Sequence, residues 1–197
     1  LTVSSGSGNV TFTGIVGGAS GGALGALTVN STGATTFSAA VTAASVTTNT
    51  GGTTAINGGA ITTTGAQIYN DAVTLGATTT LTSSGSGAIN FVSTLNGAYA
   101  LTANTSGATT FGASVGGTTN LTSITTDAGG TVVINGGAIT TTSFQTYNDA
   151  LTIGAATTLS ASAITTGSTI TASANNLTLT TDAISIGGNL TGTGALV

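Results

Sequence analysis

Four aspartates are the only side chains in this chain of 197 residues that carry a charge at neutral pH. They are Asp71, Asp127, Asp149 and Asp182, and the sequence has no Lys, Arg, His, Cys or Glu. General acid–base and nucleophilic catalysis mostly rely on the missing residues, and so do zinc, haem and iron–sulfur sites. The chemistry left open is that of carboxylates, which bind calcium or, in pairs, cleave polysaccharides.

Asp71 and Asp149 occupy the same place in a repeated Tyr-Asn-Asp-Ala segment. One interpretation is a calcium or sugar contact, made together with Asn70 or Asn148. We favour a turn, because Asn and Asp side chains hydrogen-bond their own backbone in turns. At four coils apart the two carboxylates would be separated by about 19 Å, whereas carboxylate pairs in glycosidases lie about 5–10 Å apart. We therefore expect no enzyme, no catalytic residue and no cofactor, and keep these two aspartates only as metal candidates.

Composition narrows the possible partners. The net charge is −4 and there is no cation to neutralise phosphates, so we expect no nucleic-acid partner. No long apolar run is present, so we expect no membrane insertion. Hydrophobic residues make up 39% of the chain and mean hydropathy is +0.48. Abundant Thr, Val and Ile favour a folded chain rich in strands over a disordered one.

Two periods run through the sequence. The segment 62–75 returns as the segment 140–153, at an offset of 78. Bulky apolar residues recur along the chain at uneven intervals. Nine intervals cover 174 residues, so their mean length is 174/9, or 19.3 residues. We expect these ten residues to share one structural column in the core, and we expect the long repeat to equal four short ones. The members are Phe12, Phe37, Ile56, Leu75, Phe91, Phe111, Ile134, Ile153, Ile170 and Ile186.

Each ~19-residue unit has the residue pattern of three short strands separated by turns. Residues 73–75, 79–82 and 88–91 alternate apolar and small polar side chains and are separated by Gly, Ala and Ser. This pattern predicts an all-β fold, a parallel β-solenoid with about three short strands per ~19-residue coil and about ten coils. Leu, Ile, Val and Phe should fill the interior, and Thr and Ser should face outward.

The predicted organisation is a single solenoid segment over residues 1–197. Within it the superrepeat covers about 4–82 and 83–160, with a partial copy over 161–197. The rival fold is a tandem of antiparallel sandwich domains, since the long repeat is near the size of one such domain. The division of the long repeat into ~19-residue parts argues against it, as does the absence of Trp and Cys.

Several stretches resemble a known family. Residues 61–91, 101–117 and 183–196 look like the β-strand repeats of large bacterial surface and secreted proteins, similar to filamentous haemagglutinin-like adhesins and autotransporter passenger domains. The resemblance implies a right-handed parallel β-helix that is secreted to the extracellular side or the cell surface. It also implies a role as a stalk or adhesive fibre.

The expected function is therefore a stiff, protease-resistant structural rod. Neither end of the sequence carries a polar cap, so we expect self-association through open solenoid ends or continuation in a longer chain. The alternative is a binding module for ice or carbohydrate on a Thr/Asn-rich face, for which Thr178 and Thr180 are candidates, with a host or surface glycan as a partner. Tyr69 and Tyr147 are candidates for sugar stacking, although a core position fits them better.

Overall fold

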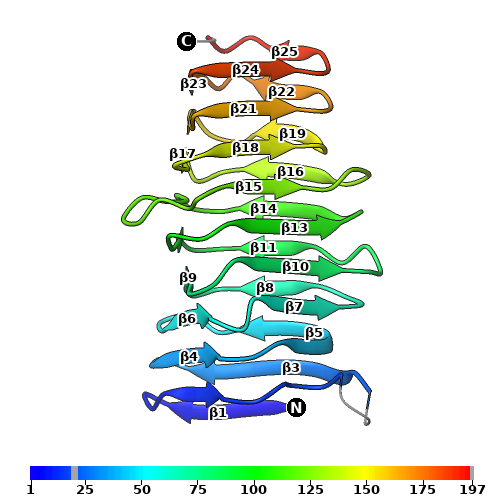
Figure 1. Cartoon of the computed structure of the whole chain (residues 1–197), viewed down its shortest axis with the longest axis vertical. Helices are drawn as coiled ribbons and strands as arrows, with labels where there is room; N and C mark the ends of the chain where they lie inside the picture. Colours follow the sequence, from blue (N-terminus) through cyan, green and yellow to red (C-terminus); the bar gives the residue numbers. More distant parts are fainter. Residues whose placement is uncertain (19–21, 196–197) are drawn as a thin grey trace.

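The structure, a computed structural model, describes residues 1–18 and 22–195 and is a parallel β-solenoid (Figure 1). Strands stack along one axis, and each pairs in parallel with the equivalent strand one turn away. A turn takes about 20 residues, and the number of turns, about eight, is close to the expected ten. The prediction of an all-β parallel solenoid is confirmed. None of the described residues forms a helix that could span a membrane.

Three flat faces surround the core. On face 1 the strands run to the right in Figure 1, and on face 2 they run to the left. Face 1 contains β7 (Ala60–Thr63), β10 (Thr79–Ser83), β13 (Leu101–Thr105), β15 (Ile124–Thr126), β18 (Phe144–Tyr147), β21 (Ala163–Thr166) and β24 (Ala183–Ile186). Face 2 contains β8 (Gln67–Tyr69), β11 (Ile89–Phe91), β14 (Ala108–Phe111), β16 (Thr131–Ile134), β19 (Ala150–Ile153), β22 (Ile170–Ser173) and β25 (Leu190–Gly192).

Face 3 and the first coils complete the three-sided solenoid, which has the shape of a prism. Face 3 contains β2 (Val10–Phe12), β4 (Ala34–Phe37), β6 (Thr53–Ile56), β9 (Ala72–Leu75) and β12 (Leu95–Asn96), then β17 (Ala138–Thr140), β20 (Thr157–Ser160) and β23 (Leu177–Thr180). Single bridges from Val115 to Leu95 and to Ile139 join the two groups. Strand β1 (Thr2–Gly6) pairs with β3 (Leu24–Ser31), which pairs with β5 (Val41–Thr48). Because β5 pairs with both β7 and β8, it bends from face 1 onto face 2.

Alternation along each strand decides which side chains enter the core. In β10, Thr79, Leu81 and Ser83 are buried, and Thr80 and Thr82 point outward. Successive Cβ atoms of a strand point to opposite faces, so a short strand contributes only two or three side chains to the narrow interior. Short strands with small outward residues are therefore sufficient to build each wall.

The central prediction about stacking is confirmed. Phe91, Phe111 and Ile134 are register partners on consecutive strands of face 2. The rings of Phe91 and Phe111 are stacked, with centroids 5.7 Å apart and an interplanar angle of 2°. Tyr69 continues the stack beneath Phe91 at 5.4 Å. Aligned aromatic rings are thus one of the columns that hold successive turns in register.

The ten predicted column residues nevertheless do not share one column. Phe12, Phe37, Ile56 and Leu75 are stacked on face 3. Phe91, Phe111, Ile134 and Ile153 are stacked on face 2. Ile170 lies in the neighbouring column of face 2, opposite Leu151, and Ile186 lies on face 1, opposite Thr166.

The physical reason is the length of the shortest steps. The step from Leu75 to Phe91 is one of them, and it carries the chain only from β9 on face 3 to β11 on face 2. The equally short step from Ile170 to Ile186 likewise ends two strands later. Two strands are two thirds of a turn, so these two steps move the bulky position to the preceding face, whereas the other steps span a whole coil.

The long repeat departs from four coils for the same reason. From β8 to its copy β18 the chain passes eleven strand positions, namely β9 to β14, the Val115 bridge and β15 to β18. At three positions per turn this is 11/3, or about 3⅔ turns. Each copy of the repeat therefore sits one face away from the previous copy. The same residues are therefore accommodated in β8 on face 2 and in β18 on face 1, each within a parallel ladder.

The interior also differs from the expected aliphatic filling. Threonines occupy many inward positions and are fully buried, among them Thr35, Thr48, Thr54, Thr109 and Thr126. Threonine has nearly the shape of valine, so it fits the same column. Some buried hydroxyls bond locally, as when Thr63 and Thr79 donate to the carbonyls of Gly65 and Ala77 at 2.6 and 2.8 Å. The high Thr content thus serves the core as well as the surface.

Candidate functional site

Gln67 and Tyr69 form a polar cluster inside the core. The Gln67 amide donates to the carbonyls of Ile61 and Thr82, at 3.2 and 3.0 Å, which belong to successive turns of face 1. The Tyr69 hydroxyl donates to Gln67 Oε1 at 2.9 Å. Both side chains are 0% exposed, so neither can stack on a sugar. Because the amide contacts two turns from across the core, the cluster fixes their relative register.

Gln145 and Tyr147 repeat this cluster from another face. Gln145 donates to the carbonyls of Ile139 and Ser160 on face 3 at 3.1 and 2.9 Å, and it accepts from the Tyr147 hydroxyl at 3.1 Å. Both are fully buried. The core interpretation of the two tyrosines agrees with this placement. Each glutamine joins two turns of the opposite wall, and we call this contact a glutamine clamp. The sequence pattern did not reveal these clamps.

Asp71 and Asp149 lie at corners of the solenoid. The Oδ1 atoms of Asp71 and Asp149 accept hydrogen bonds from the backbone N–H of Gly52 and Gly130, at 2.8 and 2.7 Å, in the preceding turn. Asp71 is between face 2 and face 3, and Asp149 is between face 1 and face 2. The two carboxylates are thus on different edges of the prism and do not form a pair. Within the described ranges, no group of three or more Asp residues is placed to hold a metal ion.

A column of threonines runs along the outside of face 1. Register partners Thr80, Thr102, Thr125, Thr146 and Thr165 follow one another over five consecutive strands, and we call them the threonine column. Their spacing is that of the strands, about 4.8 Å. Sequence reasoning missed this column because its steps differ from one coil to the next, and only the register shows that the insertions lie in corners.

The flanks of the threonine column are mixed. Beside Thr80 is Thr82, but the following outward positions are Asn104, Asp127 and Asn148. Thr-x-Thr pairs therefore do not repeat from coil to coil on this face. Thr178 and Thr180, the sequence candidates, lie on β23 of face 3, where their partners are Thr158 and Ser160. In the part of the chain that the structure describes, neither face carries a regular double file of threonines.

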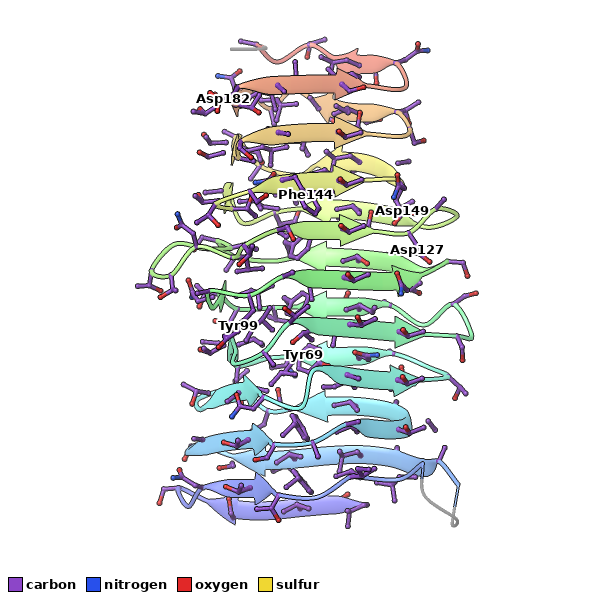
Figure 2. All side chains as sticks on the ribbon, in the orientation of Figure 1. Tyr69, Tyr99, Asp127, Phe144, Asp149 and Asp182 are labelled. Carbon is purple, nitrogen blue, oxygen red and sulfur yellow. The ribbon has the colours of Figure 1, made fainter. Side chains whose placement is uncertain are left out.

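Two aromatic side chains are exposed where strands of face 1 begin, and both are labelled in Figure 2. Phe144 at the start of β18 is 43% exposed, and Tyr99, just before β13, is 41% exposed. By contrast, Tyr69, Tyr147 and three phenylalanines are among the most deeply buried side chains. Exposed rings beside hydroxyl and amide groups are a combination that suits contact with a sugar ring. This feature could have been suspected from the sequence only by noting that Tyr99 and Phe144 fall outside the inward alternation.

The last described coil leaves core positions open. Ile184 and Ile186 of β24 stand opposite the buried Ile164 and Thr166, yet they are 49% and 37% exposed. Leu190 of β25 is 36% exposed and borders a cavity of about 220 Å³ together with Ala172 and Leu177. Apolar side chains of β24 and β25 are therefore exposed at this end of the described residues.

Comparisons with known proteins return no match. No protein-family model matches the chain, and neither the curated proteins nor the solved structures include a significant match. The fold is established by the strand pairing of this chain alone.

Proposed function

We propose that this chain is a structural segment of a bacterial extracellular fibre or adhesin stalk, and that it has no enzymatic activity. The observation that supports the proposal is the continuous series of parallel ladders along one axis, in which backbone hydrogen bonds link each turn to the next. Such a stack resists bending because deformation must act on many ladder bonds together. The family resemblance of residues 61–91 and 101–117 supports the extracellular location.

The composition fits an exposed structural role. The chain has no Lys or Arg, so trypsin-like proteases find no cleavage site in it. The stacked faces carry almost no charge, which avoids like charges repeating about every 4.8 Å. Both features favour a long-lived rod outside the cell.

Self-association, or continuation in a longer chain, through the apolar end at β24 and β25 is the second part of this proposal. Ile184 of β24 offers an exposed apolar surface where one more coil would cover it. We expect copies to join end to end, and negative-stain electron microscopy of the purified chain would show filaments that lengthen with concentration. Ile184→Lys should leave single rods. Val92→Lys is the matched control, since Val92 is also 49% exposed but follows β11 in the middle of the rod. Single rods from the unmodified chain would end the self-association proposal.

The extracellular role has its own test. Antibody labelling of intact producing cells should decorate filaments or stalks outside the cell envelope. Label confined to the cell interior would contradict the proposal even if the purified chain forms rods.

A binding module is the second candidate, favoured by the threonine column and the two aromatic side chains exposed where strands of face 1 begin. Thr125 lies in the middle of the column, so Thr125→Lys should abolish binding to a glycan array, or freezing hysteresis, if face 1 is the binding surface. Thr36→Lys places the same change outward on face 3 and should leave binding intact. No activity in the unmodified chain would leave the structural role as the function.

A further inference from the structure

Two carboxyl groups are buried in a chain that has no cationic side chain. Asp71 and Asp149 are each 2% exposed, and the chain contains no Lys, Arg or His. In each residue Oδ1 accepts one backbone N–H, from Gly52 or Gly130. The other oxygen, Oδ2, is buried and has no hydrogen-bond partner. An ionised carboxylate in this setting is poorly compensated, because burial of charge requires a counter-charge or several donors.

A hydroxyl that also lacks a partner accompanies each carboxyl group. The Thr54 hydroxyl lies beside Asp71, and the Thr126 hydroxyl lies beside Asp149. Both threonines are 0% exposed, and neither Oγ1 makes a hydrogen bond of good geometry. A protonated carboxyl group could donate from Oδ2 to this hydroxyl oxygen. One bound proton would then satisfy two buried polar atoms at each corner.

The two corners differ in one charged group. Asp127 and Asp149 lie in successive turns at the same corner (Figure 2), and Asp127 Oδ1 accepts from the Thr105 N–H at 2.9 Å. At the equivalent corner Asn49 replaces Asp127 and accepts from the Ser31 N–H at 2.8 Å. Tyr69 and Tyr147 each precede one of these aspartates by two residues, and both are buried with their hydroxyls bonded to Gln67 and Gln145. Among the described residues, therefore, Asp149 faces a second carboxylate, and Asp71 faces only a neutral amide.

We infer that the Asp71 and Asp149 corners are proton-binding sites that tighten the solenoid in acid, with the Asp149 corner responding more strongly. The inference is independent of the proposed function. At these two corners a bound proton, and no ion pair, compensates the buried carboxyl group, so acid conditions favour the fold.

The direction of the pH effect on stability follows from the difference in aspartate pKa between the folded and the unfolded chain. Burial raises the pKa of Asp71 above its ordinary value of 3.8, although the Gly52 N–H and Thr54 partly offset it. Burial also raises the pKa of Asp149, and the charge of Asp127 raises it further. The folded chain thus binds protons more tightly than the unfolded chain. Stability is greatest below the ordinary aspartate pKa, declines as pH rises from there through the raised pKa, and then levels off.

Thermal unfolding followed by circular dichroism tests the inference. Between about pH 3 and about pH 7 we expect the midpoint of the unmodified chain to fall by several degrees. Asp149→Asn should remove the larger part of this dependence and leave what Asp71 supplies, and Asp127→Asn should reduce the dependence less, because burial is the larger cause of the raised pKa of Asp149. Asp182→Asn removes an exposed carboxylate and should preserve the profile. A midpoint that is constant, or that rises with pH, would overturn the inference.

A direct measurement keeps the test decisive if a variant does not fold. Carboxyl-carbon NMR of the unmodified chain should show that the Asp149 carboxyl group is still largely protonated at pH 3.8, the ordinary aspartate value, and ionises only above it. An Asp149 carboxyl group that is ionised at every pH above that value would overturn the proposed proton site, whatever the variants do.

Discussion

Gln67 and Gln145 make the same set of hydrogen bonds from two different faces of the solenoid. Gln67 projects inward from face 2 toward face 1, and Gln145 projects inward from face 1 toward face 3. The two glutamines lie one long repeat apart in the sequence and eleven strand positions apart along the chain. The relationship shows that one sequence module can be built into two different faces. An outward feature encoded in the repeat would consequently be displayed around the rod and not along one side.

Loss of a glutamine clamp should destabilise the chain. Gln145→Leu removes the acceptor of the fully buried Tyr147 hydroxyl. We expect the free energy of unfolding to drop by about 1–3 kcal/mol, because a buried polar group is left without a partner. Urea denaturation followed by circular dichroism measures the loss. Adding Tyr147→Phe should restore part of it, since the unpaired hydroxyl is then gone. Equal stability of the single variant and the unmodified chain would show that the clamp contributes nothing.

Close corner packing should make two glycines irreplaceable. A Cβ added to Gly58 would overlap the carbonyl group of Ala39, and one added to Gly136 would overlap that of Ala113. Backbone cannot rotate away as a side chain can, so Gly58→Ala and Gly136→Ala should each destabilise by about 1–3 kcal/mol or more. Gly14→Ala is the control, because nothing lies within 4 Å of its added Cβ. The thermal midpoints of the three variants decide the matter, and equal midpoints would contradict the close packing.

Alkaline solution should unfold the chain before its core tyrosines ionise. Burial raises the pKa of both Tyr69 and Tyr147 far above their ordinary value of 10.0. The folded state retains these protons while the unfolded state loses them, so stability falls as pH rises above that ordinary value. Tyrosinate absorbance and circular dichroism recorded together should change in step for these two residues. Tyr147→Phe should weaken the dependence, and complete ionisation with unchanged dichroism would contradict the burial.

Like charges placed in one outward column should repel. Thr28 and Thr47 are register partners about 4.8 Å apart. The double variant Thr28→Lys/Thr47→Lys should lose about 1 kcal/mol beyond the sum of the single variants at low salt. The penalty should vanish near 1 M salt, where screening acts within about 3 Å. Thr28→Lys with Thr110→Lys is the control, because the two positions are four strands apart in the same column. Additive double-variant cycles in both cases would refute the electrostatic reason for the uncharged faces.

The sequence by itself determined the fold class and the local strand pattern. Alternation in segments such as 79–82 marks short strands, and the steps between bulky residues mark a solenoid, because both signals depend only on neighbours along the chain. The same locality explains why Asp71 could be assigned to a corner from its Asn-Asp context.

Only the tertiary structure decided which strand lies over which. Register depends on how many residues each turn places in its corners. The short step from Leu75 to Phe91 resembles a small coil in the sequence, but the strand pairing shows that it covers only two thirds of a turn. The threonine column, the cross-core contacts of Gln67 and the unpartnered oxygen of Asp149 all follow from that register. They join side chains from different turns, and no local pattern in the chain fixes the sequence distance between such partners.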